Sequence, residues 1–228
     1  MRHVLARGLP TLLDKHRGAL ALCRRCGHDD PAVLPILSLA RAPRVMLVGQ
    51  APGKTEVGDR RAFAGRAGRT LFRWLLRAGI DEEGFREKVY IAAMTRCYPG
   101  PNPTEGRGGR GDRVPTPRER AACASWLDDE LRIIKPQLLI PVGRLAIDRF
   151  IGCGRLDEII GAEHLVSYSG GESRAIPLPH PSGASSWIND PSHKSLLDRA
   201  LVLLRNAFAE LWDVRPRHRQ GRTASCVP

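Results

Sequence analysis

A short apolar run that ends in a glycine- and proline-containing turn most constrains how this chain can fold. Residues 45–48 read VMLV, which predicts a buried strand, and residues 49–53 read GQAPG, a turn that neither a strand nor a helix can continue through. A polar loop follows, and a helix is expected from about residue 68 to residue 78. A loop at the carboxyl end of a buried strand is where an open α/β sheet binds its ligand. An ordinary strand-to-helix connection is the alternative.

Strands and helices alternate along the rest of the chain. Further strands are expected at 88–94, 137–142, 163–169 and 174–178. Further helices are expected at 9–22, 116–135, 143–150 and 190–212. Thr116 and Asp190 each precede a proline, the pattern of a helix N-cap followed by proline at the first helical position. This alternation predicts a parallel or mixed sheet covered by helices on both faces.

The length of the chain suits a single domain. The 228 residues, of which 42% are hydrophobic, are enough for one α/β domain with a sizeable core. The sequence shows neither an internal repeat nor a domain break, so residues 1–213 are expected to form one domain. The basic tail at 214–228 is expected to be disordered.

The charge balance is strongly basic. Thirty-six Lys and Arg against 24 Asp and Glu give a net charge of +12, which fits a polyanionic partner, with nucleic acid as the first candidate. No apolar run approaches the roughly 18 residues of a membrane span. The first 22 residues carry charges throughout and lack the apolar region of a signal peptide. We therefore expect a monomer in the cytoplasm, associated with the nucleoid and without a membrane partner.

Four of the six cysteines fall into a pattern that suits a metal centre. Cys23 and Cys26 form a CxxC knuckle followed by a glycine, and Cys97 and Cys123 lie at the ends of expected elements. Four thiolates suit either a structural zinc or a [4Fe-4S] cluster, and their spacing alone does not decide between the two. The alternative is two buried free cysteines and a chance CxxC.

Two turns at the ends of strands carry the candidate chemistry, GQAPG at 49–53 and HPSG at 180–183. Neighbouring parallel strands would bring both turns to one edge of the sheet. His180 in such a turn can donate a hydrogen bond to a departing anion, although a single histidine in a turn is more often structural. These positions suit a reaction in which negative charge develops on a leaving group.

The side chains around these turns suit cleavage of the bond between a base and its sugar. Gln50 or Glu56 can place a water, and Phe63 offers a flat face on which a base can stack. Ser182 and the neighbouring glycines let backbone N–H groups approach a phosphate. Together these groups would suit hydrolysis of an N-glycosidic bond in a nucleotide that has been flipped out of the duplex.

Three segments carry a resemblance to a known family. VGQAPGKTEVGDRRAFAGRAGRTL, IAAMTRCYPGPNP and LPHPSG resemble the uracil-DNA glycosylase superfamily, and most of all its iron–sulfur branch, often called family four. The resemblance covers roughly residues 20–210, and the four cysteines match the cluster ligands of that branch. It implies a three-layer α/β/α sandwich with a central, mainly parallel four-stranded sheet and room for more strands at its margin. It also implies a [4Fe-4S] cluster rather than zinc.

The resemblance assigns roles to individual residues. In the family, the first motif holds the water and stacks the base, and the second supplies the histidine and pinches the DNA backbone. The catalytic residues implied here are Gln50, Glu56 and His180, and the base-binding residues are Ala51, Phe63 and Ala93. The motifs and the residues flanking them are expected to contact DNA through Gly65, Arg66, Arg69, Ser182, Gly183 and Trp187. Phosphate contacts are also expected from Arg107, Arg110 and Arg113, the alternative being a solvated loop.

This chain departs from the family pattern at three positions. Gln50 stands where the family usually has a carboxylate, and it can orient water but cannot take its proton at neutral pH. Ala93 stands where the family often has an asparagine that reads the edge of uracil, so base choice is expected to be relaxed. Ala184 stands where a bulky residue often wedges into the duplex, a place that Trp187 or an arginine of the 106–113 loop can fill.

We therefore expect a monofunctional DNA repair glycosylase that releases uracil, and possible substrates extend to other deaminated or damaged bases. No lysine is counted within the motifs, so neither a Schiff base nor strand cleavage is expected. The alternative is a non-catalytic DNA-binding module with an iron–sulfur cluster or zinc, its active site decayed at Gln50 and Ala93. A relative that bonds covalently to the abasic site through an extra histidine is disfavoured, because no histidine lies between Arg44 and Pro101.

Overall fold

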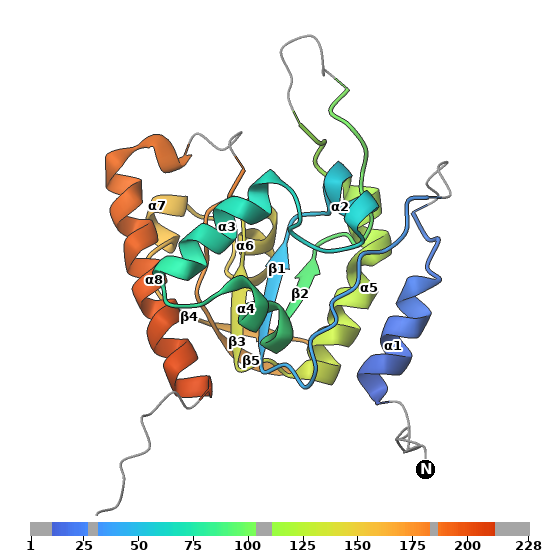
Figure 1. Cartoon of the computed structure of the whole chain (residues 1–228), viewed down its shortest axis with the longest axis horizontal. Helices are drawn as coiled ribbons and strands as arrows, with labels where there is room; N and C mark the ends of the chain where they lie inside the picture. Colours follow the sequence, from blue (N-terminus) through green and yellow to red (C-terminus); the bar gives the residue numbers. More distant parts are fainter. Residues whose placement is uncertain (1–10, 27–31, 104–110, 183–186, 213–228) are drawn as a thin grey trace, which may run out of the picture.

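The expected strands form one sheet, although the last of them lies at 171–175 and overlaps the expected 174–178 only at its final two residues. The protein is described by a computed structural model that covers residues 11–26, 32–103, 111–182 and 187–212. Five strands lie in the order β2-β1-β3-β5-β4 (Figure 1). Their bounds are β1 Val45–Gly49, β2 Val89–Ala93, β3 Leu138–Pro141, β4 His164–Tyr168 and β5 Gly171–Ala175.

The sheet has one strand more than the four expected. β1, β2, β3 and β5 are parallel, whereas β4 pairs antiparallel with β5 at the margin. Gly170 and Gly171 connect β4 to β5 with positive φ angles of 123° and 159°. So short a connection can only join antiparallel neighbours, because a parallel pair needs a long crossover. The mainly parallel sheet is confirmed, and the hairpin adds its fifth strand.

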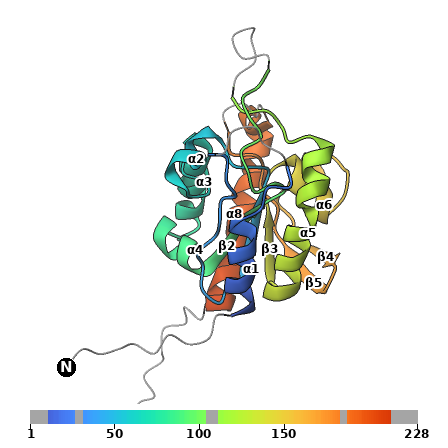
Figure 2. The same ribbon diagram turned by 90° about the vertical axis from the view of Figure 1, so that its right-hand side faces the viewer.

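Helices cover both faces of the sheet, so the expected three-layer sandwich is confirmed (Figure 2). On one face lie α3 (Arg66–Arg77), α4 (Glu82–Lys88) and α8 (Pro191–Trp212), packed on Val45 and Leu47 of β1. On the other face lie α1 (Leu12–Ala21) and α5 (Pro117–Ile134), packed on Met46 and Val48. All five residues of β1 are buried. β1 is apolar on both faces and therefore packs against the helices on both sides of the sheet.

The expected helix starts are present. The Thr116 side chain accepts from the backbone N–H of Glu119, and the Glu119 carboxylate accepts from the backbone N–H of Thr116, which completes a capping box. The Asp190 carboxylate accepts from the backbone N–H of Ser192 at 2.8 Å. α6 (Arg144–Phe150) also lies where a helix was expected. Short elements that the sequence did not indicate are α2 Lys54–Asp59, α4, α7 Leu156–Ile159 and the 3-10 turn η1 Trp187–Asn189.

The parallel strands place their carboxyl ends at one edge of the sheet. Gly49 at the end of β1 lies opposite Ala93 at the end of β2, and Val142, just after β3, bridges to Leu178, which leads into the second turn. Both turns and the segment after β2 therefore meet at this edge, as the sequence predicts. In the part of the chain that the structure describes, no helix is long and apolar enough to cross a membrane.

Candidate active site

A cavity of about 750 Å³ opens at this edge of the sheet. It is bounded by the first turn, α2, the start of α3, the segments after β2 and the second turn. All six residues expected to act on the base or the water line it: Gln50, Ala51, Glu56, Phe63, Ala93 and His180. Gly65, Arg66 and Ser182 line it as well. The fold thus brings together residues that lie up to 130 positions apart in the sequence (from 50 to 180).

His180 is held by its own turn. Its Nδ1 atom lies 2.8 Å from Oγ of Ser182 and accepts a hydrogen bond from the backbone N–H of Ser182 at 3.3 Å. An Nδ1 that accepts leaves the ring proton of a neutral imidazole on Nε2. Burial lowers the pKa of His180 below its ordinary value of 6.5, so the ring is neutral at pH 7. His180 lines the cavity, and its neutral ring therefore has an Nε2–H group free of the contact with Ser182 and available to donate.

The space for His180 depends on a glycine beside it. A Cβ atom at Gly143 would lie 2.8 Å from Cδ2 of His180, closer than real Cβ contacts come. Gly143 also has φ = 82°, a conformation that other residues rarely adopt. The turn after β3 thus needs glycine both for its own backbone and for the histidine ring.

Phe63 has an unusual backbone conformation. Its φ is +53°, a left-handed value that costs a bulky residue about 1–3 kcal/mol. A Cβ atom at Gly49 would lie 3.0 Å from the Phe63 ring, and one at Gly68 would lie 1.8 Å from the Phe63 carbonyl oxygen. These two glycines let the aromatic ring lie against the end of β1 at the cavity wall.

Glu56 joins the two ends of the loop that carries Phe63. One carboxylate oxygen accepts from the backbone N–H of Gly53 at 3.0 Å, and the other accepts from the backbone N–H of Gly65 at 2.9 Å. Glu56 as a whole is 7% exposed. Two charge-assisted hydrogen bonds to backbone amides make Glu56 a fixed negative charge at the cavity wall.

Gln50 and Ala93 lie side by side through backbone pairing. The backbone N–H groups of Met94 and Thr95 donate to the carbonyl oxygens of Gly49 and Gln50 at 2.9 and 3.3 Å. Both Gln50 and Ala93 are half-buried. The methyl group of Ala93 brings no hydrogen-bonding group to the cavity, which fits the expected loss of an amide reader.

Three charged residues at the cavity were missed from the sequence: Lys54, Arg96 and Asp112. Lys54 directly follows the first turn and lines the cavity, so the expectation that the motifs contain no lysine is wrong. Asp112 also lines the cavity, and its Oδ2 atom would lie 2.7 Å from a Cβ atom at Gly53. Its position in a glycine- and arginine-rich loop gave no signal that a carboxylate would return to the first motif.

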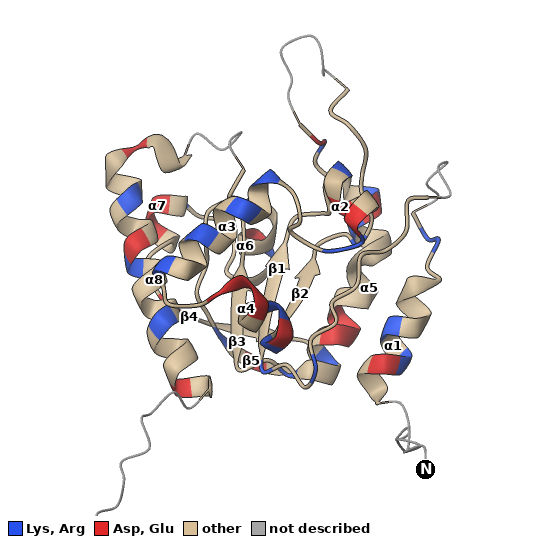
Figure 3. Cartoon of the chain, in the orientation of Figure 1, with Lys and Arg blue, Asp and Glu red and all other residues tan. Residues whose placement is uncertain are grey.

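The residues expected to contact DNA occupy different environments. Arg66, Arg69 and Arg73 are exposed along α3, which Figure 3 shows as a row of basic positions above the sheet. The Arg113 guanidinium instead donates to both oxygens of Glu119 at 2.6 and 2.7 Å. The Trp187 ring stacks on His193 with centroids 4.2 Å apart. Three residues of the DNA-contact prediction lie outside the described part of the chain: Arg107, Arg110 and Gly183. Ala184 lies outside it as well.

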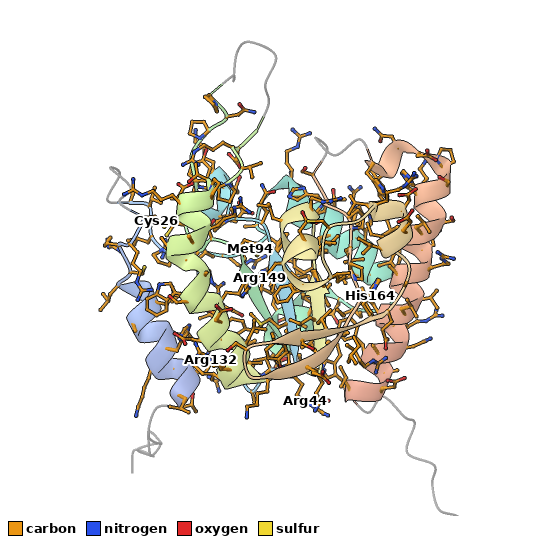
Figure 4. The ribbon with its side chains drawn as sticks, turned by 180° about the vertical axis from the view of Figure 1, so that it is seen from behind. Cys26, Arg44, Met94, Arg132, Arg149 and His164 are labelled. Atoms are coloured by element: carbon orange, nitrogen blue, oxygen red, sulfur yellow. The ribbon has the colours of Figure 1, made fainter. Side chains whose placement is uncertain are left out.

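The four cysteines of the expected metal centre lie near one another. Burial is the first cause that raises the pKa of Cys97 to about 12, and the neighbouring Cys26, Cys123 and Cys23 raise it further. Burial likewise raises the pKa of Cys123 to about 11. Figure 4 shows Cys26 beside the amino-terminal half of α5, the helix that carries Cys123. Across the described ranges, no three His, Cys, Asp or Glu side chains are arranged to hold a single metal ion.

Hydrogen-bond donors and a buried ionic group surround these cysteines. Nε1 of Trp126 donates to the Cys23 sulfur at 3.2 Å. Behind them, the fully buried Glu130 accepts from Arg96 and from the Tyr90 hydroxyl at 2.8 Å, and it lies 3.3 Å from the His16 ring nitrogen. This group joins α1, the end of β2 and α5, the three segments that bring in the cysteines. The environment fits a group that takes four thiolates from distant parts of the chain.

Comparisons with known proteins agree with this geometry. A family profile described as "Uracil DNA glycosylase superfamily" matches residues 38–203. The chain is 34% identical over 139 residues to the Type-4 uracil-DNA glycosylase of Thermotoga maritima, covering 61% of this chain and 65% of that protein. It is 26% identical over 201 residues to the Type-4 enzyme of Sulfurisphaera tokodaii, covering 85% and 83%. It is 29% identical over 167 residues to that of Archaeoglobus fulgidus, covering 70% and 76%.

The matched region runs from just before β1 into α8 and includes both turns, the cavity and two of the four cysteines. The resemblance to the family-four branch is thereby confirmed, and the matches support a uracil-DNA glycosylase function in DNA repair. The alignment spans just under two thirds of the Thermotoga protein. With the family profile matching well over half of its length, this chain belongs to the uracil-DNA glycosylase superfamily.

Proposed function

We propose that this protein hydrolyses the N-glycosidic bond of uracil in DNA, and also that of other deaminated or damaged bases, leaving an abasic site. The observation that carries this proposal is that His180, whose Nδ1 is held by Ser182, and Phe63 line the same cavity. DNA is the partner implied by family membership, and the arginines along α3 supply the basic surface that such a partner requires.

Each residue at the cavity has a separate proposed role in the reaction. The flipped base stacks on Phe63. As the glycosidic bond breaks, its electron pair leaves with the base, and His180 donates a hydrogen bond to the developing anion. Gln50 positions a water that adds to C1′ of the sugar, and the water's proton ends on the released base. The sugar passes through a cationic state, which the fixed charge of Glu56 stabilises and which makes a strong base at position 50 unnecessary.

The four cysteines Cys23, Cys26, Cys97 and Cys123 would hold a [4Fe-4S] cluster, with zinc as the less favoured group. The cluster would supply iron–thiolate bonds that tie the end of α1, the segment after β2 and α5 together. None of the four cysteines lines the cavity, so the cluster would take no part in the chemical step.

The enzyme is proposed to be monofunctional, and the position of Lys54 makes a direct test necessary. A lysine that attacked the abasic sugar would form a Schiff base, which borohydride reduces to a permanent protein–DNA bond. Incubation of the protein with uracil-containing DNA and borohydride should give no such bond. A trapped complex that disappears in Lys54→Ala would overturn monofunctional action while leaving base release intact.

A base-release assay tests the proposed function itself. Oligonucleotides bearing uracil, hypoxanthine, xanthine or an oxidised pyrimidine should be incubated with the protein and the released base quantified. Release of uracil supports the enzyme. The second candidate, a DNA-binding module with a decayed active site, is favoured by Gln50 and Ala93, and it would bind the same DNA while releasing no base from any of the four.

Base choice should depend on position 93. Ala93→Asn would restore an amide beside Gly49 at the cavity wall, where it can pair with one base edge and leave others unpaired. We expect its preference for uracil over hypoxanthine to rise roughly tenfold or more, because an unpaired polar group in a site is costly. The ratio of the two kcat/KM values measures this. If the wild type releases only uracil and the ratio does not change, the account of relaxed specificity is wrong.

The exposed arginines of α3 should contact phosphates. Replacing Arg66 and Arg69 together by glutamine is expected to reduce the slope of log affinity against log salt by about two, close to one unit per lost phosphate contact. Arg132→Gln is the matched control, because Arg132 is an exposed helical arginine of α5 that pairs with Asp129. A slope that stays the same in the double variant would show that α3 is simply a solvated basic face.

A further inference from the structure

Arg86 on α4 grips the backbone of the loop that carries Phe63. Its Nη1 donates to the carbonyl oxygen of Ala62 at 2.7 Å, and its Nη2 donates to that of Phe63 at 3.1 Å. Its Nε donates to Glu82 at 2.8 Å. The guanidinium is also stacked 4.5 Å from the Phe72 ring centroid, so its plane is fixed from several sides. One side chain therefore holds two successive carbonyl groups in a set direction.

Arg86 contacts the backbone at Phe63, which has an unfavourable left-handed conformation. Phe63 is one of four non-glycine residues with positive φ in the described part of the chain, and the only aromatic among them. A left-handed bulky residue persists only when its surroundings hold it there. Glu56 fixes the next part of the loop through Gly65, but it does not reach the Phe63 carbonyl. Arg86 makes the side-chain contact that does.

The ring direction follows from the backbone direction. Because Gly49 brings the end of β1 to within contact of the Phe63 ring, a rotation of the 62–63 peptides would move that ring off the cavity wall. We propose that Arg86 is a positioning residue that holds Phe63 in its left-handed conformation and so sets the face on which the flipped base stacks. This inference rests on the proposed stacking role of Phe63.

Arg86→Met removes the donors while keeping an unbranched stem beside Phe72. We expect the single-turnover rate of uracil release to fall roughly 10- to 100-fold, as a misplaced contact to the reacting group does, while affinity for DNA changes little. Arg61→Met is the matched control. Arg61 lies in the same loop, is exposed and donates to the same Glu82 oxygen at 2.6 Å. The carbonyl groups of Ala62 and Phe63 are held by Arg86 instead, so the rate of Arg61→Met should stay within about twofold of wild type.

A double-mutant cycle separates positioning from general support of the fold. If Arg86 acts through the Phe63 ring, Arg86→Met should cost less than about threefold in a Phe63→Ala background, because the ring it positions is already gone. An equal loss in both backgrounds would overturn the inference, since it would mean that Arg86 acts on the rate by another route.

Backbone hydrogen exchange gives a readout that does not require activity. Amides of residues 62–65 should exchange at least several-fold faster in Arg86→Met than in wild type or Arg61→Met, because their carbonyl anchors are lost. Unchanged exchange at residues 62–65 would refute the positioning role of Arg86, even if the rate of uracil release fell. If the wild type releases no base at all, the proposed function fails, and the exchange measurement still decides whether Arg86 holds this loop.

Discussion

His180→Ala is expected to lower the single-turnover rate of uracil release by about 100-fold or more, with affinity for DNA nearly unchanged. The reason is the Nε2–H donor of His180. The contacts of Nδ1 with Ser182 hold the ring in place, and burial favours its uncharged form. A single pre-positioned donor to a developing anion contributes roughly 3 kcal/mol to the transition state, and that energy corresponds to two orders of magnitude in rate. Rapid-quench assays under enzyme excess measure the chemical step directly.

The control is a histidine of the same sheet that lies outside the cavity. The His164 ring on β4 contacts the carbonyl oxygen of Ile159 at 2.9 Å, and Figure 4 shows it away from the sheet edge that carries the two turns. His164→Ala should therefore change the rate by less than about threefold. If His180→Ala retained more than a tenth of the wild-type rate, the donor role would have to be abandoned.

The same burial predicts how the reaction responds to pH. Because burial lowers the pKa of His180, the folded protein binds this proton at a lower pH than an exposed histidine, whose pKa is about 6.5. The rate should therefore stay level as the pH falls from 8 through 6.5, where an exposed histidine would already titrate. The unfolded chain takes up the proton first, so the stability contribution of a neutral His180 is lost as the pH drops below about 6.5. His180→Ala should lack that part of the acid sensitivity.

The layers of the fold could be predicted from the sequence because burial leaves a plain signature. Residues 45–48 are apolar without alternation, which is what a strand buried on both faces requires, and β1 is buried throughout. The capping box at Thr116 fixed the start of α5 for a similarly local reason. The fifth strand was foreseen as a segment, whereas its place in the sheet depends on a tight glycine turn between β4 and β5.

The sequence predicted which residues come together at the candidate site, but it did not predict the hydrogen bonds that hold them there. Two turns at strand ends must meet in a parallel sheet, so Gln50 and His180 could be placed together from the sequence alone. The partners of Glu56 could not, since they are backbone amides of Gly53 and Gly65 that converge only in three dimensions. Arg86 lay in a segment without any motif, and its contacts depend on how α4 packs beside the loop.

The arginine-rich loop shows the limit of reasoning from composition. Three arginines among glycines predicted a phosphate-binding loop, yet the one that the structure describes, Arg113, is engaged by Glu119 through two hydrogen bonds. Glu119 was recognised only as part of a helix start. A carboxylate that caps a helix can also pair with a neighbouring cation. The order of residues along the chain does not show which arginine it will pair with.

Cys97→Ala is expected to abolish the cluster and to lower the thermal midpoint by roughly 10 °C, a shift that corresponds to a few kcal/mol in a chain of this length. Wild-type protein purified without oxygen should be brown and absorb broadly near roughly 400 nm, as iron–thiolate clusters do. The physical reason for the loss of stability is that metal–ligand bonds made only in the folded state add directly to folding free energy. Iron and sulfide analysis together with thermal unfolding measures both effects.

Cys153→Ser is the matched control, because Cys153 is an exposed free thiol far in the sequence from the four expected ligands. It should keep the colour and the wild-type midpoint. His180→Ala, measured beside it, should also keep the colour while losing activity, since its contacts lie within the second turn. Colourless wild-type protein with one zinc per chain would instead assign the four thiolates to zinc. Glu130 of α5 contacts both Arg96 after β2 and His16 of α1, so it joins these three segments without metal. The Cys97→Ala protein is therefore expected to retain its sheet and to lose stability before it loses its fold.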